Sequence, residues 1–382
     1  MPLFVKITFL PFLFAAIFGV VLRAQVPGVP SDSGQMPPDS TKRTDTARAR
    51  RGRVNVIPIV YSTPEAGVGF GARVVYVFRN RQDTRNRPST FPVTLVYTTK
   101  RQTIARAQAD WWWKQNLYHL SGQVGYLNYP FKFYGVGNQQ PNEAEEFYTT
   151  QLGDVFVQGE KRIAPNLYAG GRYEFRYEQI TRKEPNRILD TRAVRGAGGQ
   201  RSSGLGLTLG YDTRDNIFQP TGGHFHQFSA LAYPVFLGSR DPFGRYRLDL
   251  RRYVGAFSGH TLAFQAQFTV IGGKPPFQQL ALIGGPDLAR GYFEGRFRDR
   301  NMMVYQAEYR LPLPFFGGRF KAVAFGSAGQ VANRPGDYSL DGFHYAAGAG
   351  LRYRFNQEGL NIRFDVAYGQ TSFLYFAFNE AF

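Results

Sequence analysis

The strongest constraint on this chain is a long series of segments in which apolar and polar residues alternate. In segment 305–311 every odd position is apolar and every even position is polar, and segments 343–355 and 361–368 repeat the pattern with few exceptions. Because successive side chains of a strand point to opposite sides of the sheet, each segment predicts a strand with one apolar and one polar face. Strands of soluble sandwiches usually run about 5–6 residues. These segments reach about ten to fifteen, and a tilted strand needs about 9–11 to cross a bilayer. We therefore predict an all-β fold, a transmembrane antiparallel β-barrel.

About sixteen such segments follow one another. They lie near 54–62, 67–79, 91–100, 102–113, 117–129, 149–164, 166–181, 201–215, 222–235, 243–258, 260–272, 300–313, 318–332, 343–355, 359–369 and 372–382. The connections mostly alternate between short turns, such as 114–116 and 165–166, and long loops, such as 182–200 and 273–299. Bacterial barrels have short periplasmic turns and longer external loops, so we expect both termini to be periplasmic. The long connection 80–90 falls on the periplasmic side and is an exception that this pattern does not explain.

The composition agrees with a barrel that has a wet interior. The chain holds 35 Phe and 23 Tyr, which aromatic girdles at two bilayer interfaces would explain. A mean hydropathy of −0.33 is too polar for a bundle of membrane helices, but only every second residue of a barrel strand faces lipid. The net charge of +18 allows nucleic-acid binding, or a basic lumen and basic loops that face anionic lipid head groups. Since the arginines recur singly along strands and in loops, we expect that the protein does not bind nucleic acid. The expected partners are outer-membrane lipids.

The N-terminal region has the features of an export signal. Lys6 precedes an apolar run over 7–22, and Ala24 offers a small residue for cleavage. An uncleaved anchor is the alternative, but the run is short for a spanning helix of about 20 residues. Pro, Ser and Asp residues and a short arginine run then predict a solvated tail, or one that contacts lipid head groups. The expected domains are a signal peptide over 1–24, a disordered periplasmic linker over 25–53 and an outer-membrane β-barrel over 54–382.

Candidate catalytic and cofactor sites are scarce. The chain has no cysteine, so it can form no disulfide and no thiolate metal site. His224 and His226 point to one strand face and could begin a metal site, or serve as polar side chains at the interface. Trp111, Trp112 and Trp113 precede a turn as an interfacial anchor, or alternatively as a stacking platform. No nucleophile elbow or phosphate-binding loop occurs, so we predict that the protein is not an enzyme and has no metal or cofactor.

Five stretches give the segment 54–382 a resemblance to a known family. They are the opening hairpin Pro58–Gly67, the loop Phe133–Asn138, the turn Tyr211–Gly223, the loop Gly284–Tyr292 and the closing strand 372–382. In this order they resemble the C-terminal surface-antigen barrel of the BamA/TamA outer-membrane assembly superfamily. The turn's matching residues are Asp212, Arg214, Asp215, Pro220 and Gly222.

The resemblance implies that the long sixth loop folds into the lumen, with Arg290, Gly291 and Tyr292 at its tip. An arginine buried there needs a carboxylate partner. Glu308 is the preferred partner and Asp365 the second, because both face the inferred interior. Ser327 stands where relatives often carry an Asp, so the contact could be wired differently. The alternative is an ordinary exposed loop arginine.

The resemblance also implies an insertion signal on the last strand, carried by Phe376, Phe378 and Phe382. Glu380 occupies a position on that face where an apolar residue is commoner.

The implied function is assistance in inserting or translocating protein, or lipid, at the outer membrane. Relatives usually carry POTRA domains, and residues 25–53 are too few to form one. The expected partners are therefore nascent outer-membrane proteins or a separate periplasmic protein. Pro58 removes one donor from the first strand, which is consistent with a weak seam between the first and last strands. A passive porin-like channel and a structural surface antigen are the alternatives.

Overall fold

The computed structural model describes residues 52–382 except 64–66, 80–85, 258, 315–316 and 356–358. Sixteen strands form one antiparallel sheet in sequence order, and two further short strands pair with each other. The strands of the large sheet are β1 Arg53–Thr63, β2 Gly67–Phe78, β3 Ser89–Thr98, β4 Thr103–Trp113, β5 Tyr118–Phe133, β6 Glu146–Ala164, β7 Leu167–Lys183, β8 Gln200–Asp212, β9 Gly223–Tyr233, β10 Phe243–Ala256, β11 His260–Gly273, β14 Asn301–Leu313, β15 Phe320–Ala332, β16 His344–Arg354, β17 Asn361–Tyr368 and β18 Ser372–Phe378. The predicted all-β barrel of about sixteen strands is confirmed. The expected signal peptide and linker lie outside the described residues.

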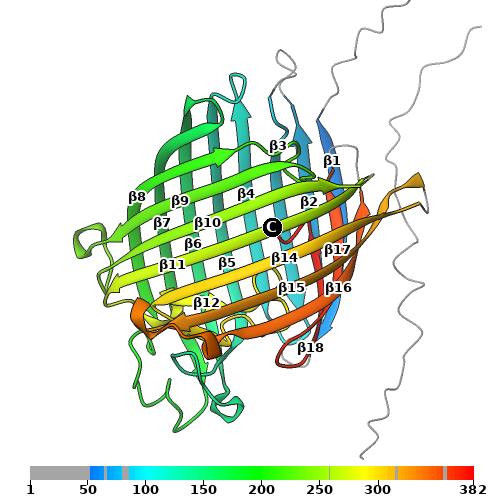
Figure 1. Ribbon diagram of the computed structural model, residues 1–382. Helices are drawn as coiled ribbons and strands as arrows, with labels where there is room; N and C mark the ends of the chain where they lie inside the picture. Colours follow the sequence, from blue (N-terminus) through cyan, green and yellow to red (C-terminus); the bar gives the residue numbers. More distant parts are fainter. Residues whose placement is uncertain (1–51, 64–66, 80–85, 258, 315–316, 356–358) are drawn as a thin grey trace, which may run out of the picture. The chain divides into compact units, whose positions relative to one another are not determined.

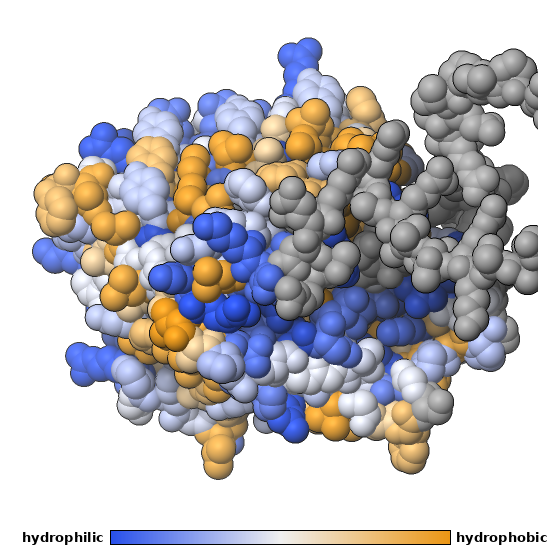
Figure 2. Space-filling view, turned by 90° about the horizontal axis from the view of Figure 1, so that it is seen from above, coloured by the Kyte–Doolittle hydropathy of each residue, from blue (hydrophilic) through white to orange (hydrophobic). Residues whose placement is uncertain are grey.

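The sheet curls so that its first and last strands lie on the same side of the molecule (Figure 1). Outward positions carry exposed apolar residues, such as Leu205, Leu207 and Leu209 on β8. Inward positions carry buried polar residues, such as Gln265 and Gln267 on β11. Hydrophilic side chains gather across the middle of the end view, and hydrophobic ones toward its margin (Figure 2). The period-two pattern of the sequence is therefore the pattern of an apolar wall around a polar interior.

The connections divide between two ends of the sheet. One end, here called the turn end, carries short turns such as 114–117, 165–166 and 257–259. The opposite end, here called the loop end, carries long connections such as 184–199 and 274–300. Among the described residues, five 3-10 turns lie at the loop end: Asn142–Ala144, Val235–Leu237, Phe277–Gln279, Pro335–Asp337 and Leu340–Gly342. Among the described residues, no helix is long and apolar enough to cross a membrane.

The connection 274–300, here called loop six, lies inside the curve of the sheet. It contains the short hairpin of β12 (Ala281–Ile283) and β13 (Phe297–Asp299). Ile283 of this hairpin packs in one buried cluster with Val304 of β14 and Val331 of β15. The expectation that the sixth loop folds into the lumen is therefore confirmed.

The predicted final strand 372–382 is too long. β18 ends at Phe378, and Asn379 follows with a left-handed φ of +61°. The last residues then turn inward across the lumen, where Phe382 packs against Tyr253 and Ala263 of the opposite wall. Glu380 already breaks the alternation on this face, and Asn379 bends the chain out of the sheet one residue earlier.

Candidate functional site

The tip of loop six is held by a buried arginine. Arg290 donates from Nη1 to Oδ2 of Asp365 on β17 over 2.6 Å, and from Nη2 to Oε1 of Glu308 on β14. All three side chains are buried, and the Arg290 guanidinium stacks on the Phe325 ring at 3.5 Å from its centroid. The structure thus brings Arg290 together with both expected carboxylates. Register places Ser327 opposite Gln306 on β14, and Ser327 is not among the residues that hydrogen bond or pair with Arg290.

Gly291 and Tyr292 complete the tip. Gly291 has a φ of +115°, and a Cβ added there would lie 2.7 Å from the backbone carbon of Tyr368. Its amide donates to the Tyr375 hydroxyl over 3.1 Å, and its carbonyl accepts from the Gln370 amide over 3.0 Å. The Tyr292 hydroxyl donates to the carbonyl of Tyr345 over 2.8 Å. Only a glycine fits this approach without strain, so the tip is fitted closely to the last strands.

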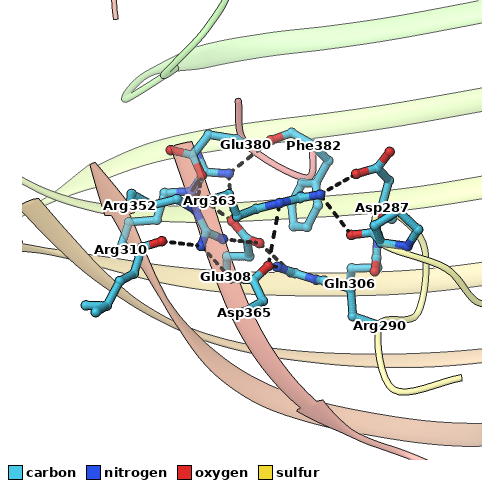
Figure 3. A network of polar contacts seen from close by, with 12 residues as sticks. Asp287, Arg290, Gln306, Glu308, Arg310, Arg352, Arg363, Asp365, Glu380 and Phe382 are labelled. Atoms are coloured by element: carbon cyan, nitrogen blue, oxygen red, sulfur yellow. Dashed lines mark hydrogen bonds and ion pairs between the residues drawn. The ribbon is translucent and has the colours of Figure 1, made fainter. Parts of the chain in front are cut away.

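Further charges surround the Arg290 contact (Figure 3). Arg310 donates from Nε to Glu308 over 2.9 Å, and Arg352 bridges Asp365 and Glu380, the latter over 2.8 Å. Glu380 is therefore an interior carboxylate of the inward-turning tail, which explains a polar residue where an apolar one was expected. Tail, wall and loop six are joined in one network because Arg310 also donates to the carbonyl of Phe382 over 2.9 Å.

A second arginine fastens the start of the tip. Arg363 of β17 donates to Oδ1 of Asp287 over 2.6 Å and to the carbonyl of Pro286 over 3.1 Å. Gln306 of β14 accepts from the amide of Ala289 over 2.8 Å. Loop six is thus held on both sides of Arg290.

The loop between β5 and β6 holds the base of loop six. The amide of Gly137 donates to the carbonyl of Arg298 over 2.8 Å, and Arg296 donates to the carbonyl of Gln140 over 2.6 Å. In the same loop, partial burial alone would raise the pKa of Glu145, but contacts with Tyr134 and a neighbouring lysine hold that pKa below its usual value. The stretch 133–138 singled out in the sequence therefore anchors the sixth loop.

The turn motif between β8 and β9 lies over the turn end of the lumen. Asp212 accepts from Arg214 over 2.8 Å and also pairs with Arg87. Asp215 accepts from the amide of Thr221 over 2.9 Å. The carbonyl of Pro220 accepts from Arg310 over 3.3 Å.

This turn also reaches the far side of the barrel. Its Phe218 is buried with Ile57 of β1 and Val75 of β2. The carbonyl of Gly222 accepts from the amide of Asp215 over 3.3 Å, which closes the turn on itself. Arg87 lies in the long connection that the sequence pattern left unexplained. Its bond to Asp212 shows that the described part of this connection packs onto the same end.

The seam between β1 and β18 differs from every other strand junction. Among the described residues, β1 pairs only with β2, and β18 only with β17. Side chains bridge the gap instead, since Phe378 packs in the cluster that contains Ile57. Phe376 points outward and is 47% exposed. The predicted insertion residues therefore have three different surroundings: Phe376 on the outer wall, Phe378 at the seam and Phe382 in the lumen.

The remaining candidates lie apart from this network. His224 and His226 do share a face, which is the outer one, with ring centroids 5.2 Å apart. No group of three or more His, Asp or Glu that could hold a metal occurs in the part of the chain that the structure describes. Trp111 points outward, whereas Trp112 is buried and stacks on His119 at 3.8 Å. The tryptophan run thus faces outward only at alternate positions.

The family model described as "Omp85 superfamily domain" matches residues 86–379. The chain belongs to the Omp85 superfamily. Two solved structures share the fold. BamA from Haemophilus ducreyi lacking POTRA domains 1–3 has a TM-score of 0.54 at 14% identity, over 86% of this chain and 69% of that one. CdiB from Escherichia coli has a TM-score of 0.55 at 10% identity, over 86% of this chain and 60% of that one. No curated protein sequence matches.

Membership in the Omp85 superfamily confirms the family resemblance read from the sequence, and barrels of this family are outer-membrane proteins. The matched region contains loop six, the β8–β9 turn and most of the tail. Sequence reasoning missed Arg310 and Arg352 as network members. Their parity was a usable signal, because both share the inward face with Glu308 and Asp365.

Proposed function

We propose that this Omp85 protein assists the insertion or translocation of protein at the outer membrane, with the seam between β1 and β18 as its working surface. The observation that carries the proposal is the absence of backbone pairing between these two strands among the described residues. Unpaired strand edges can accept an incoming strand through main-chain hydrogen bonds. Family membership supports this role in general terms.

In this proposal both termini face the periplasm, so that the turn end does so too. Nascent outer-membrane proteins, or a separate periplasmic partner that delivers them, would approach the seam from that side. The role requires no bond-breaking step, and we propose a non-enzymatic protein. A packed lumen favours this role over a porin, because loop six and the tail occupy the interior.

A reducible crosslink across the seam tests the proposal. Because the chain has no cysteine, Ile57→Cys with Phe378→Cys can be joined by a short reducible thiol crosslinker. Val56→Cys with Val74→Cys is the matched control, since these residues are register partners on β1 and β2. The readout is how fast a small outer-membrane barrel folds into vesicles that contain each variant, with crosslink yield measured by mass spectrometry.

We expect the crosslinked seam variant to lose most of its ability to speed the folding of the small barrel. It should regain that ability when the crosslinker is reduced. The control should remain active in both states. Full activity of the crosslinked seam variant would exclude the seam as the working surface.

A further inference from the structure

A groove lies in the outer wall, away from the seam and the lumenal network. It spans β10, β11, β14 and β15 and has a volume of about 440 Å³. Its outward-facing lining includes Ala266, Ala307, Gly326 and Ala328. Register pairs Ala307 with Gly326, and it places Ala266 and Ala328 on either side of Tyr305. Larger side chains, those of Phe264 and Tyr305, also line it.

The hollow follows from side-chain size. On the outer wall of a barrel, large apolar residues usually fill the band that faces acyl chains. The small residues Ala266, Ala307 and Gly326 leave a depression beside the rings of Phe264 and Tyr305. Such a depression is apolar and open to lipid, so an acyl chain is the natural filling.

One end of the groove is cationic. Arg252 of β10 and His226 of β9 line it. Arg252 is exposed on the outer face and hydrogen bonds with His224, and Tyr211 stacks on His226 with centroids 6.1 Å apart. β10 ends at Ala256, so this patch lies near the turn end of the wall.

Among the described residues, no carboxylate neutralises the charge of Arg252. Its guanidinium instead hydrogen bonds with the imidazole of His224. A charged side chain on the lipid face is costly unless it reaches the interface or finds an opposite charge. A guanidinium beside two imidazoles at this level therefore suits the phosphate of a lipid head group.

We infer that this groove is a binding site for one glycerophospholipid of the leaflet at the turn end. Its phosphate lies against Arg252 and the two histidines, and one acyl chain lies over Ala266, Ala307 and Gly326. The site does not depend on the proposed function, because it needs neither the seam nor a client protein. The bound lipid would be a fixed component of the outer wall.

Native mass spectrometry of the refolded full chain in detergent tests the inference. The probes are phosphatidylglycerol and a diacylglycerol with the same acyl chains and no phosphate. We expect tighter binding of phosphatidylglycerol. Arg252→Gln should weaken that binding about ten-fold, as expected for losing a charge-assisted contact, and should leave diacylglycerol unchanged.

Filling the groove should weaken both lipids. Gly326→Leu is suitable because the nearest heavy atom to an added Cβ is the Ala346 carbonyl oxygen at 3.8 Å. The controls are Lys161→Gln, an outward cation near the same end of β6, and Ala349→Leu on the outer face of β16. A heat-dependent gel shift establishes that each variant is folded.

Equal effects of Arg252→Gln and Lys161→Gln, or of Gly326→Leu and Ala349→Leu, would overturn the site. Equal binding of the two lipids would overturn the role of the phosphate. Weaker binding of phosphatidylglycerol by Arg252→Gln and Gly326→Leu, with unchanged binding by the two controls, would support the inference.

Discussion

At the scale of single residues, buried charge dominates the interior. Arg290, Arg310 and Arg352 are almost completely buried beside Glu308 and Asp365. A buried pair is not a large source of net stability, but removing one partner leaves an unpaired charge out of water. Single substitutions in this network should therefore be much more damaging than similar changes on the surface.

Arg290→Ala should destabilise the folded barrel by about 3–5 kcal/mol, because it leaves Glu308 and Asp365 with one cation fewer. Arg195→Ala is the control. That arginine is 49% exposed and pairs with Asp241 over 2.6 Å, a kind of contact worth about 0–1 kcal/mol. The stability of both variants is measured by titrating the heat-dependent gel shift with urea. Equal urea midpoints for Arg290→Ala and Arg195→Ala would mean that Arg290 does not hold loop six in place.

Gly291→Ala separates close packing from backbone strain. Gly291 and Gly238 both have positive φ, but an added Cβ meets backbone at Gly291 and nothing within 4 Å at Gly238. Both variants should lose about 1 kcal/mol to backbone strain, and only Gly291→Ala should lose clearly more. Matching losses in the same titration would show that the tip has room to move.

At the scale of elements, alternation predicted the strands well because each strand separates lipid from a polar interior over its whole length. It failed where a segment leaves the sheet. Glu380 stands at an apolar position of the pattern after β18 has ended, and contacts with Arg352 and Tyr253 hold Glu380 and Phe382 in the interior. The partners of Arg290 were predictable, because strand parity placed Glu308 and Asp365 inside. For the weak seam the sequence offered only Pro58 as a sign, since backbone pairing depends on strand edges that side-chain patterns do not report.

The tail offers a test of this difference. Phe382→Ala should destabilise the barrel by about 3 kcal/mol, as for a ring removed from a packed site, because its side chain is buried against Tyr253. Phe376→Ala, on the lipid-facing wall, should have a smaller effect on stability. Both are measured by the urea midpoint of the gel shift. A larger effect at Phe376 would indicate that the tail is not docked in the lumen.

At the scale of the whole molecule, the barrel is filled from both ends. Loop six enters from the loop end, while the β8–β9 turn and the tail cover the turn end. The network around Arg290 joins loop six to the tail. Among the described residues, backbone pairing joins every two neighbouring strands of the wall except β1 and β18.

This filling predicts poor conduction. The refolded protein should show small, flickering currents in planar bilayers, and Arg290→Ala should open larger conductance levels by releasing loop six. Arg195→Ala should behave like the unmodified protein. Large, steady openings of the unmodified protein would favour the porin-like alternative.

The central claim is an open edge between β1 and β18, and amide hydrogen exchange of the refolded protein in lipid tests it most directly. Amides of β1 that point away from β2, and amides of β18 that point away from β17, should exchange far faster than those of the fully paired strands β5 and β10, because no partner strand holds them. Protection of the β1 and β18 amides equal to that of β5 and β10 would show a closed seam and contradict the account.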